Sequence, residues 1–162
     1  TKTNLNMKKL FIIGVLSLFI YACGSENKEN AAAATTEEGA KTADNSSYDP
    51  KRGEGKFTDV KLDAKLDEEM ALKGQNVSDL KCLSCHKLTD ERLVGPGWAG
   101  TTSRHTPEWI MNFITNTDEM IDKDPKAQAM LEICMVRMPN QSLSDTDARA
   151  ILEFMRKNDG VK

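Results

Sequence analysis

The sequence has 162 residues, a formal net charge of −3 at pH 7 and 39% hydrophobic residues. Polar residues are distributed unevenly, because a stretch of about forty polar residues of low complexity precedes the Cys-x-x-Cys-His motif at 82–86. About a hundred residues are then left to form a folded domain. That length suits one small domain. No cluster of basic residues is present, which argues against a nucleic-acid-binding protein.

The first segment, residues 1–22, is typical of a secretory signal peptide. Met7 is the expected initiator, so that residues 1–6 lie upstream of the true start, and two lysines and the apolar run 10–22 follow it. As a helix this run would be about 20 Å long, short of the roughly 30 Å hydrocarbon core of a bilayer. We therefore predict an export signal and no permanent transmembrane helix.

The apolar run ends in Ile20-Tyr21-Ala22-Cys23, which resembles a bacterial lipobox. The resemblance implies that Cys23 becomes the lipidated N-terminus of the mature protein. Several acyl chains together hold a protein firmly on a membrane. The alternative is an ordinary signal peptide with an incidental cysteine.

Residues 23–65 are predicted to form this lipidated start and a flexible linker. They are rich in Ala, Glu, Lys, Asn, Thr and Gly, and such a stretch cannot bury enough apolar surface to offset its ordering entropy. A flexible chain of about 40 residues reaches roughly 35–40 Å on average. Residues 57–66 are candidates for contact with the folded domain.

From Asp67 onward the hydrophobic periodicity is helical, and no alternating strand pattern is present. A first helix is expected from Asp67 to about Leu80, with Met70 and Val77 beside Leu80 on its inner face. Gly74 costs helix stability, so a close contact with another helix is the expected reason for it.

Three further helices carry clear start signals. Thr106 is an expected N-cap of a helix that ends near Asn116, and Asp124 is the N-cap of the next one; a proline follows each cap. Ser144, with an acidic residue three positions later, predicts the last helix, which ends near Lys157.

The central motif is Cys-x-x-Cys-His at residues 82–86, the attachment pattern for a c-type haem. Cys82 and Cys85 are predicted to add to the two vinyl groups of the porphyrin, and His86 to ligate the iron. A zinc site or a thioredoxin-like dithiol is the alternative. A zinc ribbon needs a second ligand pair, and a thioredoxin-like pair needs a preceding strand; the sequence predicts neither.

This arrangement resembles a class I c-type cytochrome over essentially residues 66–160. The resemblance implies an all-α fold of about four helices around one covalently attached haem c, with a cytochrome c domain at 66–162. Besides the haem motif and the glycine before it, the matching stretches are Leu93-Val94-Gly95-Pro96, Gly100-Thr101-Thr102-Ser103-Arg104, Arg137-Met138-Pro139 and Leu143-Ser144-Asp145.

Met138 is the expected sixth ligand of the iron. It follows the third long helix and precedes Pro139, so it lies in an irregular loop that can bend toward a metal, and the resemblance points to the same residue. A thioether ligand favours reduced iron and raises the potential. Met135, Met130 and His105 remain alternatives.

Three more residues are candidates for the haem site. The resemblance implies that the carbonyl of Pro96 accepts a hydrogen bond from His86 and holds its tautomer, with an ordinary turn proline as the alternative. Trp98 would line the haem and Arg104 would pair with a propionate, with ordinary packing and solvation as alternatives. Cys134 is expected to be a buried, unreactive thiol.

The predicted function is single-electron transfer between extracytoplasmic redox partner proteins of a bacterial respiratory or denitrification chain. The protein would be held to a membrane by its lipid, facing the periplasm. No catalytic residues and no small-molecule substrate are expected. One alternative is a haem enzyme or gas or peroxide sensor with an open sixth position and His105 as its distal group. Another is the cytochrome subunit of a larger oxidase or reductase.

Overall fold

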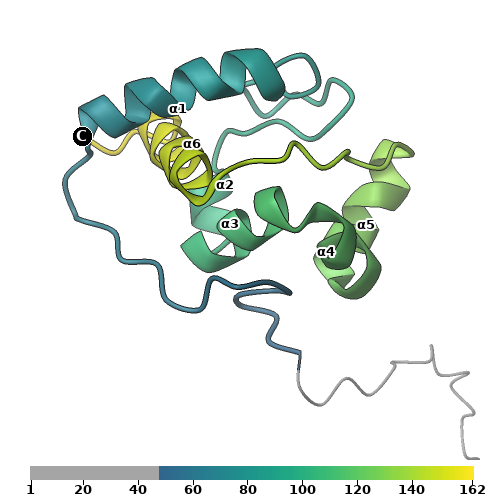
Figure 1. Ribbon diagram of the computed structural model, residues 1–162. Coiled ribbons are helices and arrows are strands. Elements are labelled where there is room, and N and C mark those ends of the chain that lie inside the picture. The colour runs from purple at the N-terminus through teal and green to yellow at the C-terminus, as the bar shows by residue number, and fades with distance from the viewer. Residues whose placement is uncertain (1–47) are drawn as a thin grey trace, which may run out of the picture. The chain divides into compact units, whose positions relative to one another are not determined.

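A computed structural model describes residues 48–162, and within them the chain forms six α-helices and no β-strand (Figure 1). These residues belong to one structural unit that begins at Ala43. None of the helices in this range is both long and apolar enough to cross a membrane. The predicted signal segment and Cys23 lie outside the described residues. The expected all-α architecture is confirmed.

The helices are α1 (Glu68–Lys81), α2 (Thr101–Arg104), α3 (Pro107–Thr115), α4 (Thr117–Lys123), α5 (Pro125–Cys134) and α6 (Asp145–Asn158). Two of them, α2 and α4, were not expected. The short α4 follows α3 almost directly because Asn116, with φ −134° and ψ 48°, leaves the helical conformation between them.

The four long helices begin where the sequence predicts. Asp67, Thr106, Asp124 and Ser144 each accept a hydrogen bond from a backbone N–H in the first turn of the following helix, at 2.8–3.2 Å. These side chains satisfy donors that have no partner within the helix. A proline occupies the first turn of α3 and of α5.

The helix α1 lies across α6 (Figure 1). A Cβ atom on Gly74 would lie 1.9 Å from the carbonyl oxygen of Ala150, so the two backbones touch at this point. The buried face of α1 is therefore Ala71, Gly74 and Ser78. The prediction that Leu80 lies on the inner face is wrong: its side chain is 87% exposed. A close crossing requires small residues, and a leucine would keep the helices apart.

Residues 48–66, which we call the strap, form an irregular segment with a turn at 50–52, and they bond to α3 and α4. The backbone N–H of Phe57 donates to the side chain of Asn112, which in turn donates to the carbonyls of Arg52 and Phe57, all at 2.9 Å. The linker predicted at 23–65 is thus too long, because residues 48–65 pack against the helices. Hydrogen bonds between backbone groups of the strap and side chains of the helices hold it in place, and amino-acid composition does not predict such bonds.

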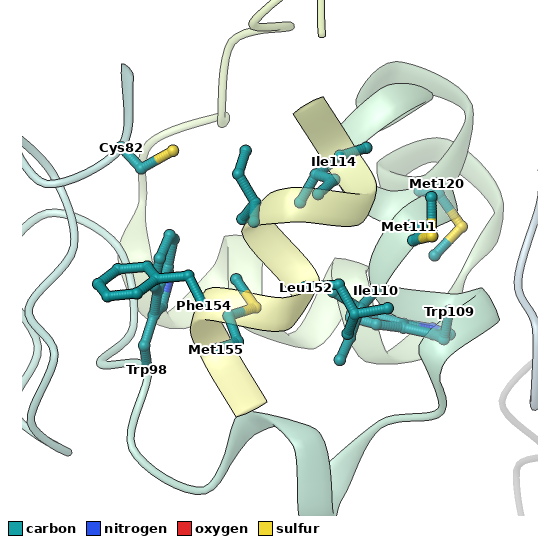
Figure 2. Close-up of a cluster of buried hydrophobic side chains, with 12 residues drawn as sticks. Cys82, Trp98, Trp109, Ile110, Met111, Ile114, Met120, Leu152, Phe154 and Met155 are labelled. Carbon is teal, nitrogen blue, oxygen red and sulfur yellow. The ribbon is translucent and has the colours of Figure 1, made fainter. Parts of the chain in front are cut away.

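The hydrophobic core lies between α3, α6 and the loop after α1 (Figure 2). Leu152 and Met155 of α6 pack at its centre, with Trp109 of α3 toward one end. Cys82, Trp98 and Phe154 lie at the opposite end in this view. The thiol of the haem motif is therefore part of the core.

Candidate functional site

The haem motif forms a tight turn at the end of α1. The N–H groups of Cys85 and His86 both donate to the carbonyl of Cys82, at 3.0 Å. Cys82 is buried, and this burial raises the pKa of its thiol. Neither Cys82 nor Cys85 is in a disulfide, so both sulfur atoms are available for covalent attachment to a cofactor.

The imidazole of His86 is fixed by the loop that follows the motif. Its Nδ1 lies 2.8 Å from the carbonyl oxygen of Pro96, the contact that the resemblance implies. The carbonyl can only accept, so Nδ1 carries the proton and Nε2 keeps its lone pair. Burial lowers the pKa of His86, although the bond to Pro96 opposes this change, and the neutral ring is the form that binds metal.

Gly95 allows the loop at 94–96 to pack directly against the ring of His86. Its N–H donates to the carbonyl of Cys85 at 2.9 Å, which folds the loop back onto the motif. A Cβ atom at this position would lie 2.4 Å from Cε1 of His86. No side chain larger than hydrogen fits there without moving the ring.

An apolar cavity brings His86 and Met138 together. Its wall comes from the haem motif, the loop at 94–96, α3, α5 and the segment after α5. The lining includes Cys85, Pro96, Phe113, Ala127, Met130 and Met138. An apolar wall that includes an imidazole suits an apolar cofactor that carries a metal.

The alternatives for the sixth ligand are placed differently. Met130 lines the same cavity as Met138. Met135 is 82% exposed at the end of α5. His105 is stacked on Trp109 with ring centroids 3.9 Å apart.

Trp98 and Arg104 lie at the end of the site near α2. The indole of Trp98 is buried with its centroid 5.6 Å from the His86 ring. The guanidinium of Arg104 donates to the carbonyl of Ala99 at 2.6 Å, and both Arg104 and Pro96 line cavities next to the first one.

His105 supplies an observation that sequence reasoning missed. Its Nδ1 is the one buried side-chain nitrogen or oxygen without a hydrogen-bond partner among residues 48–162. Burial, with the positive charges of Lys126 and Arg104, lowers the pKa of His105 to about 4. An anionic group at this place could pair with the positive charge of Arg104 and bond to the unused Nδ1 of His105, which fits a haem propionate.

The structure does not support the alternative of a zinc site. No group of three or more potential metal-binding His, Cys, Asp or Glu side chains occurs in the described range.

Comparison with known proteins decides the family. The model of the family described as "Cytochrome c" matches residues 71–159. The chain belongs to the cytochrome c family. As a c-type cytochrome it carries covalently bound haem c, and it is a haem-based electron carrier that exchanges electrons with partner proteins.

Solved structures agree with this assignment. The cytochrome c from Rhodothermus marinus is 33% identical, with a TM-score of 0.63, and the match covers 65% of this chain and 90% of that chain. An engineered form of that cytochrome is 32% identical with a TM-score of 0.62. Another engineered structure, bound to a carbene intermediate, is 32% identical with a TM-score of 0.59; both matches cover the same shares of the chains. No curated protein sequence matches the chain.

Proposed function

We propose that this cytochrome passes single electrons between extracytoplasmic redox partners while a lipid on Cys23 holds it at a membrane. The supporting observation is that His86, already oriented by Pro96, and Met138 line one apolar cavity. Two protein ligands leave the iron no open position, as an electron carrier requires, whereas an enzyme or sensor needs one.

Each site residue has a separate task in this proposal. Cys82 and Cys85 hold the porphyrin edge through thioether bonds, and His86 Nε2 and Met138 Sδ bind the iron. The haem supplies a one-electron couple when bound. Because the protein holds both axial ligands, their positions change little when the iron gains or loses an electron. The apolar wall that includes Phe113 and Met130 keeps water away from the iron.

The ligand assignment can be tested with two matched methionine variants of the exported holoprotein. Met138→Ala should abolish the weak near-infrared band of methionine–ferric iron ligation and give a high-spin ferric spectrum. After reduction, this variant should bind CO quickly. Met130→Ala, in the same cavity, should keep the band. The opposite result would make Met130 the ligand, and an unchanged spectrum in both would contradict thioether ligation.

The anchor can be tested in cells with Cys23→Ser. We expect the parent protein to incorporate labelled fatty acid and sediment with membranes, and the variant to do neither while still carrying haem. Equal sedimentation of the two proteins would contradict a lipid anchor at Cys23. The test separates the anchor from the haem site, because Cys23 lies far from residues 82–86 in the sequence.

A further inference from the structure

The segment that carries Met138 makes few hydrogen bonds with the rest of the fold. It connects α5 to α6 without regular structure (Figure 1), and within the described residues none of 136–143 takes part in a backbone–backbone hydrogen bond. In the same part of the chain, two side chains link it to other elements: Arg137 bonds to α4, and Nζ of Lys81 donates to the carbonyl of Gln141 at 2.9 Å. The position of Met138 therefore depends on side-chain contacts and apolar packing.

Both ends of this segment have an unfavourable backbone conformation. Met135 and Ser142 are the two non-glycine residues with positive φ in the described range, at 57° and 50°. Met135 ends α5 in the left-handed conformation, a position that glycine usually takes. Residues with a side chain keep this conformation only where the surrounding contacts hold them. The segment thus needs contacts that keep it in place over the cavity.

Arg137 makes more of these contacts than Lys81 does. Its Nη2 donates to the carbonyl oxygen of Asp118 at 3.1 Å and to Oδ1 of Asp122 at 2.9 Å, and its Nε donates to Oδ1 of Asp118 at 3.3 Å. The two acids are four residues apart on α4, so they lie on one face of that helix. A planar guanidinium donates in several fixed directions at once and can bond to both.

We propose that Arg137 is a positioning residue for electron transfer: its bonds to Asp118 and Asp122 hold segment 136–143 so that Met138 stays on the iron. This inference rests on the proposed function, in which Met138 is the sixth ligand. The guanidinium is bound to α4, so Arg137 acts on Met138 through the backbone that joins them. Without these bonds the segment leaves the cavity more often, and the sixth position is open for a larger fraction of the time.

The simpler explanation of these contacts is an ordinary surface ion pair. The side chain of Arg137 is 42% exposed and those of both acids are 61% exposed, and such pairs contribute little to the stability of a whole domain. Glu119 and Lys123 form a pair of this kind within α4, 2.8 Å apart. Arg137 differs because it joins α4 to a segment without backbone bonds. A small free energy changes how often such a segment opens, although global unfolding hardly registers it.

Binding of free imidazole to the ferric holoprotein measures this opening. A nitrogen of the added imidazole replaces Sδ of Met138 on the iron, and the oxidation state of the iron does not change. The apparent affinity rises in proportion to the fraction of protein whose sixth position is open. We expect Arg137→Gln to bind imidazole about fivefold more tightly than the parent. Arg137→Lys, which keeps the charge but not the forked donors, should lie between the two.

Two acids of α4 provide a matched control. Asp122→Asn removes a carboxylate that bonds to Arg137 and should tighten imidazole binding about twofold. Glu119→Gln removes one that pairs with Lys123 instead and should leave the affinity unchanged. In the Arg137→Gln background, Asp122→Asn should add nothing, because its partner is already absent. A fully additive effect would show that Asp122 acts without Arg137.

All these variants should keep the near-infrared band and a thermal transition close to the parent's, because the changed groups are exposed. The role of Arg137 is refuted if the parent shows the band but Arg137→Gln binds imidazole no more tightly. It is also refuted if Glu119→Gln tightens binding as much as Asp122→Asn does. A parent without the band would contradict the thioether ligand itself, and with it any part of Arg137 in holding that ligand.

Discussion

At the scale of single residues, the imidazole of His86, the proposed iron ligand, is positioned by backbone atoms of the loop at 94–96. A carbonyl oxygen holds one nitrogen of His86, and the Cα of Gly95 lies against the ring. Such contacts leave no freedom for the ring to rotate. If His86 binds the iron as proposed, this hydrogen bond would make the imidazole a stronger donor to ferric iron and so affect the midpoint potential.

Gly95→Ala should therefore raise the midpoint potential. The new methyl group would lie 2.4 Å from Cε1 of His86, so the ring or the loop must shift and the bond to Pro96 must weaken. A weaker bond makes the ligand less basic and favours reduced iron. Overpacking should also cost about 1–3 kcal/mol of stability. Redox titration measures the change in potential, and guanidinium unfolding measures the change in stability.

A buried ion cluster makes stability depend on acid pH. Glu153 is 1% exposed and pairs with Arg149 at 2.7 Å and Arg156 at 2.6 Å. Burial alone would raise the pKa of Glu153, but the backbone N–H of Asp67 and the two guanidiniums hold it below its ordinary value. The carboxylate thus stabilises the fold above its unfolded pKa, and this contribution is lost as the pH falls through the lower folded pKa.

Glu153→Gln should flatten that acid dependence. At neutral pH the variant leaves Arg156 buried without its partner charge and should lose about 3 kcal/mol or more. Below the folded pKa of Glu153 the difference from the parent should shrink. Unfolding free energies measured from pH 7 down to about pH 3 check the trend, and a constant difference across this range would contradict it.

At the scale of elements, the crossing of α1 and α6 depends on one missing side chain. Ala would normally favour a helix over Gly by about 1 kcal/mol. At Gly74 the opposite is expected, because a methyl group would lie 1.9 Å from a backbone atom of α6 that cannot turn aside. The elements would have to separate.

Gly74→Ala should accordingly destabilise the protein by more than its gain in helix propensity. We expect a net loss of about 3 kcal/mol, near the upper end for overpacking, or failure to fold. Chemical unfolding of the holoprotein measures it. Gln75→Ala, on the exposed side of the same helix, should stay within about 0.5 kcal/mol of the parent.

Asn112 of α3 makes three of the hydrogen bonds that hold the strap, and Glu108 and Asn116 make others. Asn112 is fully buried and makes three hydrogen bonds to strap backbone, and Gly55 passes close beside it. Asn112→Ala should cost about 1–3 kcal/mol and increase amide exchange at residues 52–57. The exposed Asn76→Ala serves as the control. Unchanged exchange in the strap would show that other contacts suffice to hold it.

At the scale of the whole molecule, the folded unit begins well before the first helix. A chain that starts at residue 43 keeps every strap contact, whereas one that starts at residue 66 leaves Asn112 buried without the groups it bonds. The shorter chain should unfold at a temperature several degrees lower than the longer one. Equal thermal transitions for the two holoproteins would mean that the strap contributes nothing to stability.

Local sequence determined most of the helical architecture and the chemistry of the motif. Side chains such as Thr106, Asp124 and Ser144 cap helices through neighbours three residues away, so their effect can be predicted without a fold. The Cys-x-x-Cys-His spacing likewise specifies a haem within one turn of chain. The family comparison confirmed the fold and the cofactor.

Tertiary structure decided what depends on contacts between distant segments. The strap and the contact of α1 with α6 both join residues far apart in the chain. Neither has a local signal, because by sequence Asn112 is a polar residue expected on a helix surface and Leu80 is an apolar residue expected in the core. The bonding partner of a side chain such as Asn112 depends on which backbone segment lies next to it. That segment takes its position only when the whole domain packs.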